Sequence, residues 1–118
     1  MRSIKRGEIW LAVLDPIVGR ELAKTRPVVV ISNDVANRRS GASTVVPVTS
    51  QKLENVWPYE VFLPLGAGGL PKDSKAKADQ IRTLDQSRFI RKLGQLPPDL
   101  VESIEGAVLI HLGWTEST

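Results

Sequence analysis

Two polar side chains stand where strand-like runs meet loops, and together they could hold a phosphate. Arg26 directly precedes Pro27 and the β-branched run 28–31, and Thr49 ends the run 44–49. If these runs form antiparallel strands, the start of one lies beside the end of the other. A guanidinium presents a rigid fork of donors that matches phosphate oxygens, and a threonine hydroxyl adds another hydrogen bond. The pair therefore predicts a site that binds a phosphate and stabilises charge developing on it.

These residue types also have ordinary structural interpretations. An arginine before a strand is usually a surface charge, and a Thr-Ser-Gln run is usually a strand end or a turn. Trp10 and Trp57 could stack on bases, or they could pack in the core or in a dimer interface. Arg38 and Arg39 form either a basic contact patch or a solvated surface, and we expect His111 to be structural.

The composition restricts the chemistry that the chain can perform. The 118 residues include no cysteine and one histidine, which excludes disulfides, thiolate metal sites and His-rich metal sites. With only one histidine, the chain cannot use a pair of histidines as acid and base, and it has no cysteine nucleophile. Catalysis must therefore use Arg, Lys, Asp, Glu, Ser, Thr or Tyr side chains. We therefore expect no metal ion and no cofactor.

Length and charge suit one small domain spanning residues 1–118. The chain is 42% hydrophobic and 25% charged, and so short a chain leaves much surface that oligomerisation would cover. A net charge of +3 permits a nucleic-acid partner without requiring one. No apolar stretch is long enough to span a bilayer, and the N-terminus lacks the apolar core of a signal peptide. We expect a cytoplasmic protein.

The hydrophobic pattern predicts a curled antiparallel sheet followed by one helix. Six strands are expected at 7–14, 27–31, 44–49, 59–63, 75–83 and 92–95. The third contains Pro47, which favours an edge or a bulge. The long loop 17–25 exceeds the usual length of a hairpin connection, and such loops are often functional.

Helical signals are few. A short helical turn is expected within 35–43, and Asp85 is a suitable cap for another. The range 96–112 predicts the one long helix, because Leu100, Ile104, Val108 and Leu112 share a face. Gly113 can end it. These elements predict a small α+β barrel.

Several short motifs, in this order and spacing, resemble the MazF/PemK family of toxins. They are RGEIWLAVLDPIVGRE, KTRPVVVISND, TVVPVTSQ, ADQIRTLD and LGQL, and the resemblance runs from about residue 5 to residue 112. It implies an SH3-like antiparallel β-barrel of the CcdB/PemK kind with a C-terminal helix, usually in a homodimer. It also implies a metal-independent, sequence-selective endoribonuclease. Such an enzyme cleaves single-stranded RNA by attack of the 2′-hydroxyl, leaving a 2′,3′-cyclic phosphate and a 5′-hydroxyl.

The resemblance also implies roles for individual residues. Arg26 and Thr49 fall on the catalytic pair of the family. In the family the arginine is drawn as acid, base or both. A guanidinium gives up protons reluctantly, so we expect Arg26 mainly to neutralise the pentavalent phosphorane, with protonation of the leaving 5′-oxygen as a secondary role. Thr49 would donate to a non-bridging oxygen, and Glu21, the only carboxylate in the loop 17–25, is the alternative base. The expected RNA-binding residues are Lys24, Ser50, Gln51, Asp79, Gln80 and Arg82.

Two departures from the family pattern concern RNA contacts. Many relatives have two glycines where this chain has Ala23 and Lys24, so its loop should be stiffer and more basic. Many also have glutamate where this chain has Asp79.

The resemblance implies a cognate antitoxin as a partner. Its acidic, disordered C-terminal segment would cover the basic dimer groove and fold on binding. One alternative is a CcdB-like poison that binds gyrase without nuclease activity, with Trp114 and the tail 113–118 as its anchor. Another is a barrel that binds RNA without cleaving it.

Overall fold

The chain forms an antiparallel sheet with one long helix. The computed structural model describes residues 3–16, 18–22 and 24–114. Its strands are β1 (Glu8–Val13), β2 (Thr25–Val30), β3 (Ala42–Thr49), β4 (Glu60–Leu63), β5 (Ser74–Lys77), β6 (Arg82–Asp85) and β7 (Phe89–Gln95). The helices are α1 (Asp34–Arg39) and α2 (Pro98–His111), with 3₁₀ turns η1 (Ala67–Gly69), η2 (Ala78–Gln80) and η3 (Gln86–Arg88).

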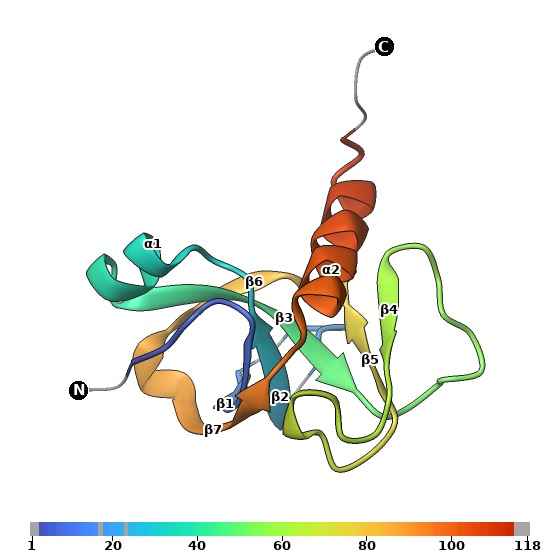
Figure 1. Cartoon of the computed structure of the whole chain (residues 1–118), viewed down its shortest axis with the longest axis horizontal. Helices are drawn as coiled ribbons and strands as arrows, with labels where there is room; N and C mark the ends of the chain where they lie inside the picture. Colours follow the sequence, from blue (N-terminus) through green and yellow to red (C-terminus); the bar gives the residue numbers. More distant parts are fainter. Residues whose placement is uncertain (1–2, 17, 23, 115–118) are drawn as a thin grey trace.

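Strand order follows a path in which β3 is central. The order is β4-β5-β3-β2-β1-β7, and β6 pairs with the first half of β3. Figure 1 shows the bent sheet with α2 standing beside β4. The predicted α+β class, an antiparallel sheet with a C-terminal helix, is confirmed. Closure into a barrel stays a prediction, because no ladder in the described ranges joins β4 to β7.

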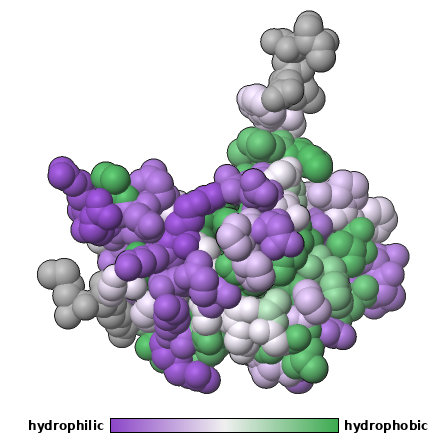
Figure 2. All heavy atoms as spheres, viewed as in Figure 1, coloured by the Kyte–Doolittle hydropathy of each residue, from purple (hydrophilic) through white to green (hydrophobic). Residues whose placement is uncertain are grey.

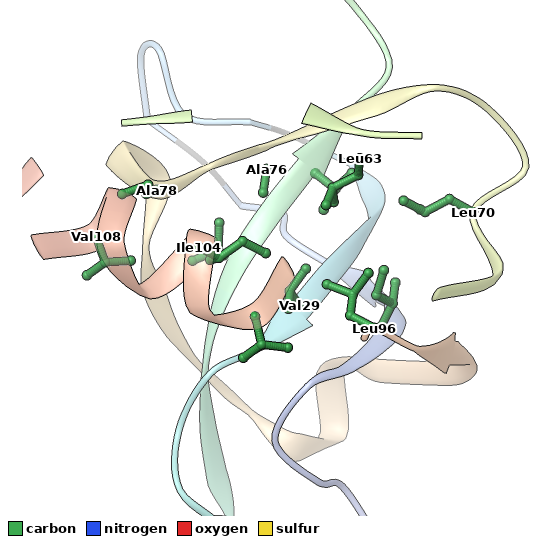
Figure 3. Packing of buried hydrophobic residues seen from close by; sticks show 13 residues of the cluster. Val29, Leu63, Leu70, Ala76, Ala78, Leu96, Ile104 and Val108 are labelled. Carbon is green, nitrogen blue, oxygen red and sulfur yellow. The ribbon is translucent and has the colours of Figure 1, made fainter. Parts of the chain in front are cut away.

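The central strands are buried on both faces. Val29 belongs to a cluster under α2, whereas Val28 and Val30 belong to a second cluster on the opposite face. This two-sided burial explains why the run is β-branched throughout rather than alternating with polar residues. Ile104 and Val108 of α2 pack on the first cluster, as Figure 3 shows.

The expected face of the long helix is confirmed in its middle and wrong at its end. Ile104 is fully buried and Val108 is 8% exposed. Leu112 is 65% exposed, because α2 ends at His111 and Leu112 is its C-cap. Gly113 follows with φ +73, the left-handed conformation that commonly ends a helix. Within the described residues, no helix is both long and apolar enough to cross a membrane.

The single strand expected at 75–83 is wrong. The chain forms β5 and β6 instead, separated by η2. Both strands pair with β3, but the register shifts by three residues, from Val48 opposite Ala76 to Val45 opposite Arg82. The turn η2 takes up these three residues, and its Ala78 packs in the cluster under α2.

We expected Pro47 to mark an edge strand or a bulge, and the edge strand is wrong. Pro47 lies in central β3, opposite Val28 of β2. On the other side of β3, the ladder to β6 stops at Val45 and the ladder to β5 starts at Val48. Proline is tolerated there because the gap between two ladders requires no backbone donor.

The remaining predicted elements are present with shifted ends. The first, second, fourth and sixth strands correspond to β1, β2, β4 and β7, and β2 begins two residues early, so that Arg26 lies inside the strand. The helical turn expected within 35–43 is α1, capped by Asn33. Asp85 caps η3 by accepting from the Ser87 amide, as predicted.

The turn η1 packs tightly on β7. A Cβ at Gly69 would lie 2.2 Å from the Leu93 carbonyl oxygen, and Gly69 has φ +80. Gly66, at the start of the same turn, has φ +92 but open space around it. The contact therefore fixes the chain immediately before Leu70 and Pro71, which line a cavity described below.

We expect Gly69→Ala to lower the free energy of unfolding by about 3 kcal/mol, from left-handed strain together with overpacking against β7. Gly66→Ala, with the strain alone, should cost about 1–2 kcal/mol. Urea titration of both variants measures the difference. Equal losses would show that η1 does not depend on the close approach to Leu93.

Candidate phosphate-binding site

The pairing of β2 with β3 brings Arg26 and Thr49 to the same part of the sheet. Val28 lies opposite Pro47, and the same register continued by two residues sets Arg26 opposite Thr49. Arg26 lies two residues before Val28 and Thr49 four after Val45, and both valines pack in the second cluster. Because strand side chains alternate, Arg26 and Thr49 project to one face of the sheet.

Two cavities of about 230 Å³ each share these two residues. The other residues that line the first cavity are Thr25, Pro27, Val48, Ser50, Leu70, Pro71, Lys72 and Ser74. The second cavity is lined by Arg20, Leu22, Gln51, Lys52, Lys75 and Lys77, and we call it the cationic cavity. Because Arg26 and Thr49 line both, they stand at the boundary between the two hollows.

The hydroxyl of Thr49 is held so that its proton remains available. Thr49 is 6% exposed, and its Oγ1 accepts a hydrogen bond from the Gln51 amide at 3.2 Å. A hydroxyl has one proton and two acceptor positions, so this contact uses an acceptor position and leaves the proton for a ligand. Arg26 is partly buried beside it.

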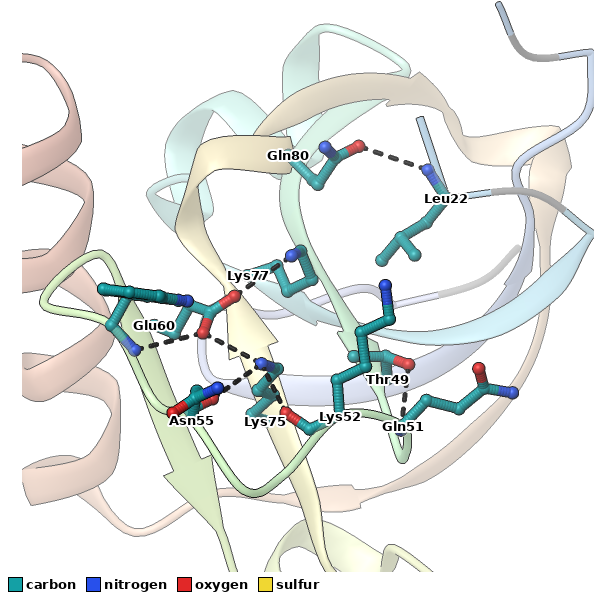
Figure 4. A network of polar contacts seen from close by, with 10 residues as sticks. Leu22, Thr49, Gln51, Lys52, Asn55, Glu60, Lys75, Lys77 and Gln80 are labelled. Atoms are coloured by element: carbon teal, nitrogen blue, oxygen red, sulfur yellow. Dashed lines mark hydrogen bonds and ion pairs between the residues drawn. The ribbon is translucent and has the colours of Figure 1, made fainter. Parts of the chain in front are cut away.

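Two lysines that line the cationic cavity, Lys75 and Lys77, belong to a buried ion network with Glu60. Glu60 lies between two lysines of β5, with Oε1 3.0 Å from the Lys75 ammonium and Oε2 3.0 Å from that of Lys77. The side chains of Glu60 and Lys75 are 1% and 4% exposed. The Lys75 ammonium also donates to the carbonyl oxygens of Lys52 and Asn55, at 2.8 and 2.9 Å (Figure 4).

The network determines the ionisation of Glu60. Burial alone would raise the pKa of this carboxyl. Hydrogen bonds from Lys75, the Trp57 amide and Lys77 outweigh burial, and the pKa of Glu60 lies below its ordinary value. The carboxylate is therefore charged at neutral pH, and the two lysines and one glutamate leave one positive charge in excess beside the cavity.

Two of the expected site residues, Glu21 and Lys24, lie in the loop 17–25, and neither lines the two cavities. The carboxylate of Glu21 accepts from the Val18 amide at 2.6 Å, and Glu21 is not among the described residues that line either cavity. Lys24 is exposed, with φ +66, and its amide donates to Asp15 at 2.9 Å. It adopts the left-handed conformation that the usual family glycine would allow more easily. Ala23 lies outside the described residues.

The motif after β5 mostly makes contacts within the protein. The amide oxygen of Gln80 accepts from the Leu22 amide at 3.2 Å (Figure 4), which ties the loop 17–25 to η2. The guanidinium of Arg82 donates to the Leu14 carbonyl at 3.2 Å. One carboxylate oxygen of Asp79 is buried and accepts no hydrogen bond from the described part of the chain. The predicted RNA contacts of these residues stay predictions.

Of the two tryptophans that could stack on bases or pack in the core, one is buried and the other is exposed. Trp10 is 7% exposed in the core, edge-on to Phe89 at 5.9 Å. Trp57 is 54% exposed. His111 is exposed, with its ring 6.4 Å from that of Tyr59.

Two surface regions lie apart from the cavities. Arg38 and Arg39 are exposed on α1, where hydrophilic residues gather in Figure 2. Hydrophobic residues gather at the far end of α2 in the same view, where Ile110 and Trp114 are each 55% exposed. Of the tail 113–118, residues 115–118 lie outside the described ranges. Among the described residues, no three His, Asp or Glu side chains cluster so as to hold a metal ion.

Sequence reasoning missed the cations that line the cationic cavity beside Arg26. They are Arg20, Lys52, Lys75 and Lys77. Only the period-two spacing of Lys75 and Lys77 signalled that two of them share a strand face. The pairing of β5 with both β3 and β4, which sets Lys75 opposite Thr49 and Lys77 opposite Glu60, had no local signal.

We expect Glu60→Gln to lower the free energy of unfolding at pH 7 by about 3–5 kcal/mol, because it leaves two lysines without their buried counter-charge. The folded-state pKa of Glu60 is lowered, so its stabilisation is present above the unfolded-state pKa and is lost as pH falls through the folded-state value. The wild-type loss of stability below about pH 5 should therefore be smaller in the variant. Thermal unfolding between pH 3 and pH 7 measures both effects.

The matched control is Glu102→Gln, an exposed carboxylate on α2. It should leave stability within about 0.5 kcal/mol of wild type. If Glu60→Gln behaves like this control, the network contributes nothing to stability.

Comparison with known proteins identifies the family and the same fold. The family described as "PemK-like, MazF-like toxin of type II toxin-antitoxin system" matches residues 5–112. Endoribonuclease MazF9 of Mycobacterium tuberculosis is 40% identical over 114 residues, covering 92% of this chain and 96% of that protein.

Two solved structures from Deinococcus radiodurans are similar throughout. MazF aligns with a TM-score of 0.84 at 29% identity, over 97% of this chain and 100% of that one. A MazE–MazF structure aligns with a TM-score of 0.72 at 29% identity, again over 97% and 100%. With the match over nearly its whole length, the chain belongs to the PemK-like, MazF-like family of toxins from type II toxin–antitoxin systems.

Proposed function

We propose that this protein is a sequence-selective endoribonuclease toxin that cleaves single-stranded RNA at the boundary between its two cavities. The observation that carries the proposal is that Arg26 and Thr49 line both cavities, one of which is strongly cationic. A guanidinium and a hydroxyl at such a boundary suit a phosphodiester whose strand runs to either side. The naming of MazF9 as an endoribonuclease supports the reaction class.

In the proposed reaction the RNA supplies its own nucleophile. The 2′-oxygen attacks the adjacent phosphorus, the bond from phosphorus to the 5′-oxygen breaks, and a 2′,3′-cyclic phosphate and a 5′-hydroxyl form. Arg26 stabilises the extra negative charge of the pentavalent phosphorane and passes a proton to the leaving 5′-oxygen. Thr49 donates its hydroxyl proton to a non-bridging oxygen, since its acceptor side is occupied by Gln51. No step requires a metal ion or a cofactor.

The proton of the 2′-hydroxyl needs an acceptor, and Glu21 is the alternative to Arg26 as that base. If Glu21 takes this proton, it later passes it to solvent, and solvent returns to Arg26 the proton given to the 5′-oxygen. In the structure the Glu21 carboxylate is held by the Val18 amide within its own loop. For Glu21 to act, that hydrogen bond must break and the loop must bring the carboxylate to the nucleophile. This role therefore depends on rearrangement of the loop.

The expected RNA contacts surround the catalytic pair unevenly. Ser50 lines one cavity and Gln51 the other, so both suit contacts with nucleotides next to the cut. For Asp79 to accept from a base donor, its buried carboxylate oxygen must first become exposed. For Gln80 and Arg82 we propose a mainly supporting role, because their side chains anchor Leu22 and Leu14. Lys24, exposed within the loop 17–25, suits a more distant phosphate.

We further propose a cytoplasmic homodimer neutralised by a cognate antitoxin. Exposed Ile110 and Trp114 at the end of α2 supply apolar surface that a second copy would cover. The cationic cavity suits an acidic segment that competes with RNA, and the MazE–MazF structure supports such pairing in a relative. The predicted mass by sedimentation equilibrium is that of a dimer, and a monomer at micromolar concentration would contradict this part.

Cleavage assays with end-group analysis test the enzymatic proposal. Wild-type protein should cut a long single-stranded RNA in EDTA and leave cyclic phosphate and 5′-hydroxyl ends. Arg26→Ala and Thr49→Ala should each fold and lose about 10²–10³-fold in cleavage rate, because each removes a group that stabilises the transition state. Arg39→Ala, an exposed arginine of α1, is the matched control and should cleave at the wild-type rate.

Full activity in both site variants would defeat the assignment. Intact RNA together with inhibited gyrase supercoiling would favour the CcdB-like alternative. Bound but uncut RNA would favour an RNA-binding barrel without catalysis.

A further inference from the structure

The ammonium of Lys75 lies beside the cationic cavity but has no proton left for a ligand. A lysine ammonium has three donors. Those of Lys75 go to the Lys52 carbonyl at 2.8 Å, the Asn55 carbonyl at 2.9 Å and Glu60 Oε1 at 3.0 Å. The side chain is 4% exposed. Lys75 is therefore built to hold the chain that follows β3 in place rather than to contact RNA.

The residue that Lys75 holds has an unusual backbone. Lys52 adopts φ +55, a left-handed conformation that costs a residue with a side chain about 1–2 kcal/mol. Such a conformation persists where its surroundings enforce it. Here the hydrogen bond from the buried Lys75 ammonium to the Lys52 carbonyl holds Lys52 in this conformation.

The held conformation sends the Lys52 side chain into the cavity that Arg26 and Thr49 line. Figure 4 shows it extending past Thr49 toward Leu22, and all of these residues line the cationic cavity. In the described part of the chain, no carboxylate lies within ion-pair distance of Lys52. Its charge is thus available to an anion.

A second cation of the cavity also retains donors. Within the described ranges the Lys77 ammonium donates one hydrogen bond, to Glu60 Oε2 at 3.0 Å, and the side chain is 23% exposed. Its ammonium keeps two further donors. Because Glu60 is shared with Lys75, this group carries one uncompensated positive charge. Lys52 and Lys77 together therefore form a wall with charge and donors suited to phosphate oxygens.

We propose that Lys52 and Lys77 form a second anion subsite, which binds the RNA phosphate next to the one held by Arg26 and Thr49, and that Lys75 is a positioning residue for Lys52. The inference rests on the proposed function for its ligand. It assigns a contact to residues outside the catalytic pair and outside the RNA-binding residues expected from sequence.

The test uses a short RNA that contains a mapped cut site, with a 2′-deoxy nucleotide at the cut so that it binds without being cleaved. Lys52→Gln should bind it about tenfold more weakly at low salt, since a charge-assisted contact is lost. The slope of log affinity against log salt should fall by about 0.7, the value for one phosphate of a single strand. With cleavable RNA, KM should rise and kcat should stay near wild type.

Three controls isolate the subsite. Lys5→Gln removes one exposed charge that lines neither cavity and should bind as wild type does. Lys52→Arg should restore binding. Lys75→Met should lose at least as much affinity as Lys52→Gln, because it releases Lys52 and also removes the excess positive charge beside the cavity. The double variant should lose less than the sum of the two single losses, because both changes remove the Lys52 contact.

Neutralising single phosphates as methylphosphonates locates the partner. A single methylphosphonate next to the cut should weaken binding to the wild-type protein about as much as Lys52→Gln does. The same methylphosphonate should not weaken binding to the Lys52→Gln protein any further. This arm and Lys52→Gln decide the matter if Lys75→Met does not fold.

The outcomes separate the two proposals. If the wild-type protein cuts RNA but Lys52→Gln keeps wild-type affinity and salt slope, the subsite is wrong and the nuclease assignment stands. If the wild-type protein neither cuts nor binds single-stranded RNA, the proposed function fails and the subsite fails with it.

Discussion

The antiparallel ladder between β2 and β3 is the constraint on which the candidate site depends. Val28 opposite Pro47 fixes the register, and two residues further the same register sets Arg26 against Thr49. Because side chains alternate along strands, a slip of one residue would turn one of the two to the opposite face. The ladder cannot slip easily, since Val28 and Val29 are buried in two different clusters. Core packing on both faces of the sheet thus determines the geometry of a site at the ends of two inner strands.

A second constraint comes from charge. Cations gathered to bind a polyanion repel one another when the ligand is absent, and burying a lysine is costly unless it is paired. Glu60 relieves this cost for Lys75 and Lys77 while its own carboxylate is kept ionised by them. The arrangement lets β5 contribute positive charge to the cationic cavity from within a packed sheet.

Sequence patterns predicted the parts of the fold that local rules control. The β-branched run of β2, the face of α2 around Ile104 and the cap at Asp85 each follow from residues close together in the chain. The proximity of Arg26 and Thr49 could be predicted because it requires only that β2 and β3 pair antiparallel. The break at η2 could not, because the alternation in 75–83 is equally compatible with one continuous strand. Only the register of β5 and β6 on β3 reveals the three additional residues.

The cationic cavity was missed for a related reason. A lysine in an exposed-looking strand is ordinarily solvated, and the carboxylate that makes burial of Lys75 tolerable lies on β4, fifteen positions earlier in the chain. The conformation of Lys52 likewise depends on a bond from β5, which no pattern in its own loop indicates.

The central claim is that Arg26 and Thr49 act on one phosphate, and a double-mutant cycle on single-turnover cleavage tests it most directly. Wild type, Arg26→Ala, Thr49→Ala and the double variant would be compared on one RNA with a mapped cut site. Groups that stabilise the same transition state are strongly non-additive, so the double variant should cleave within about threefold of the slower single variant. Losses that multiply would show that the two residues act independently, and would contradict the account.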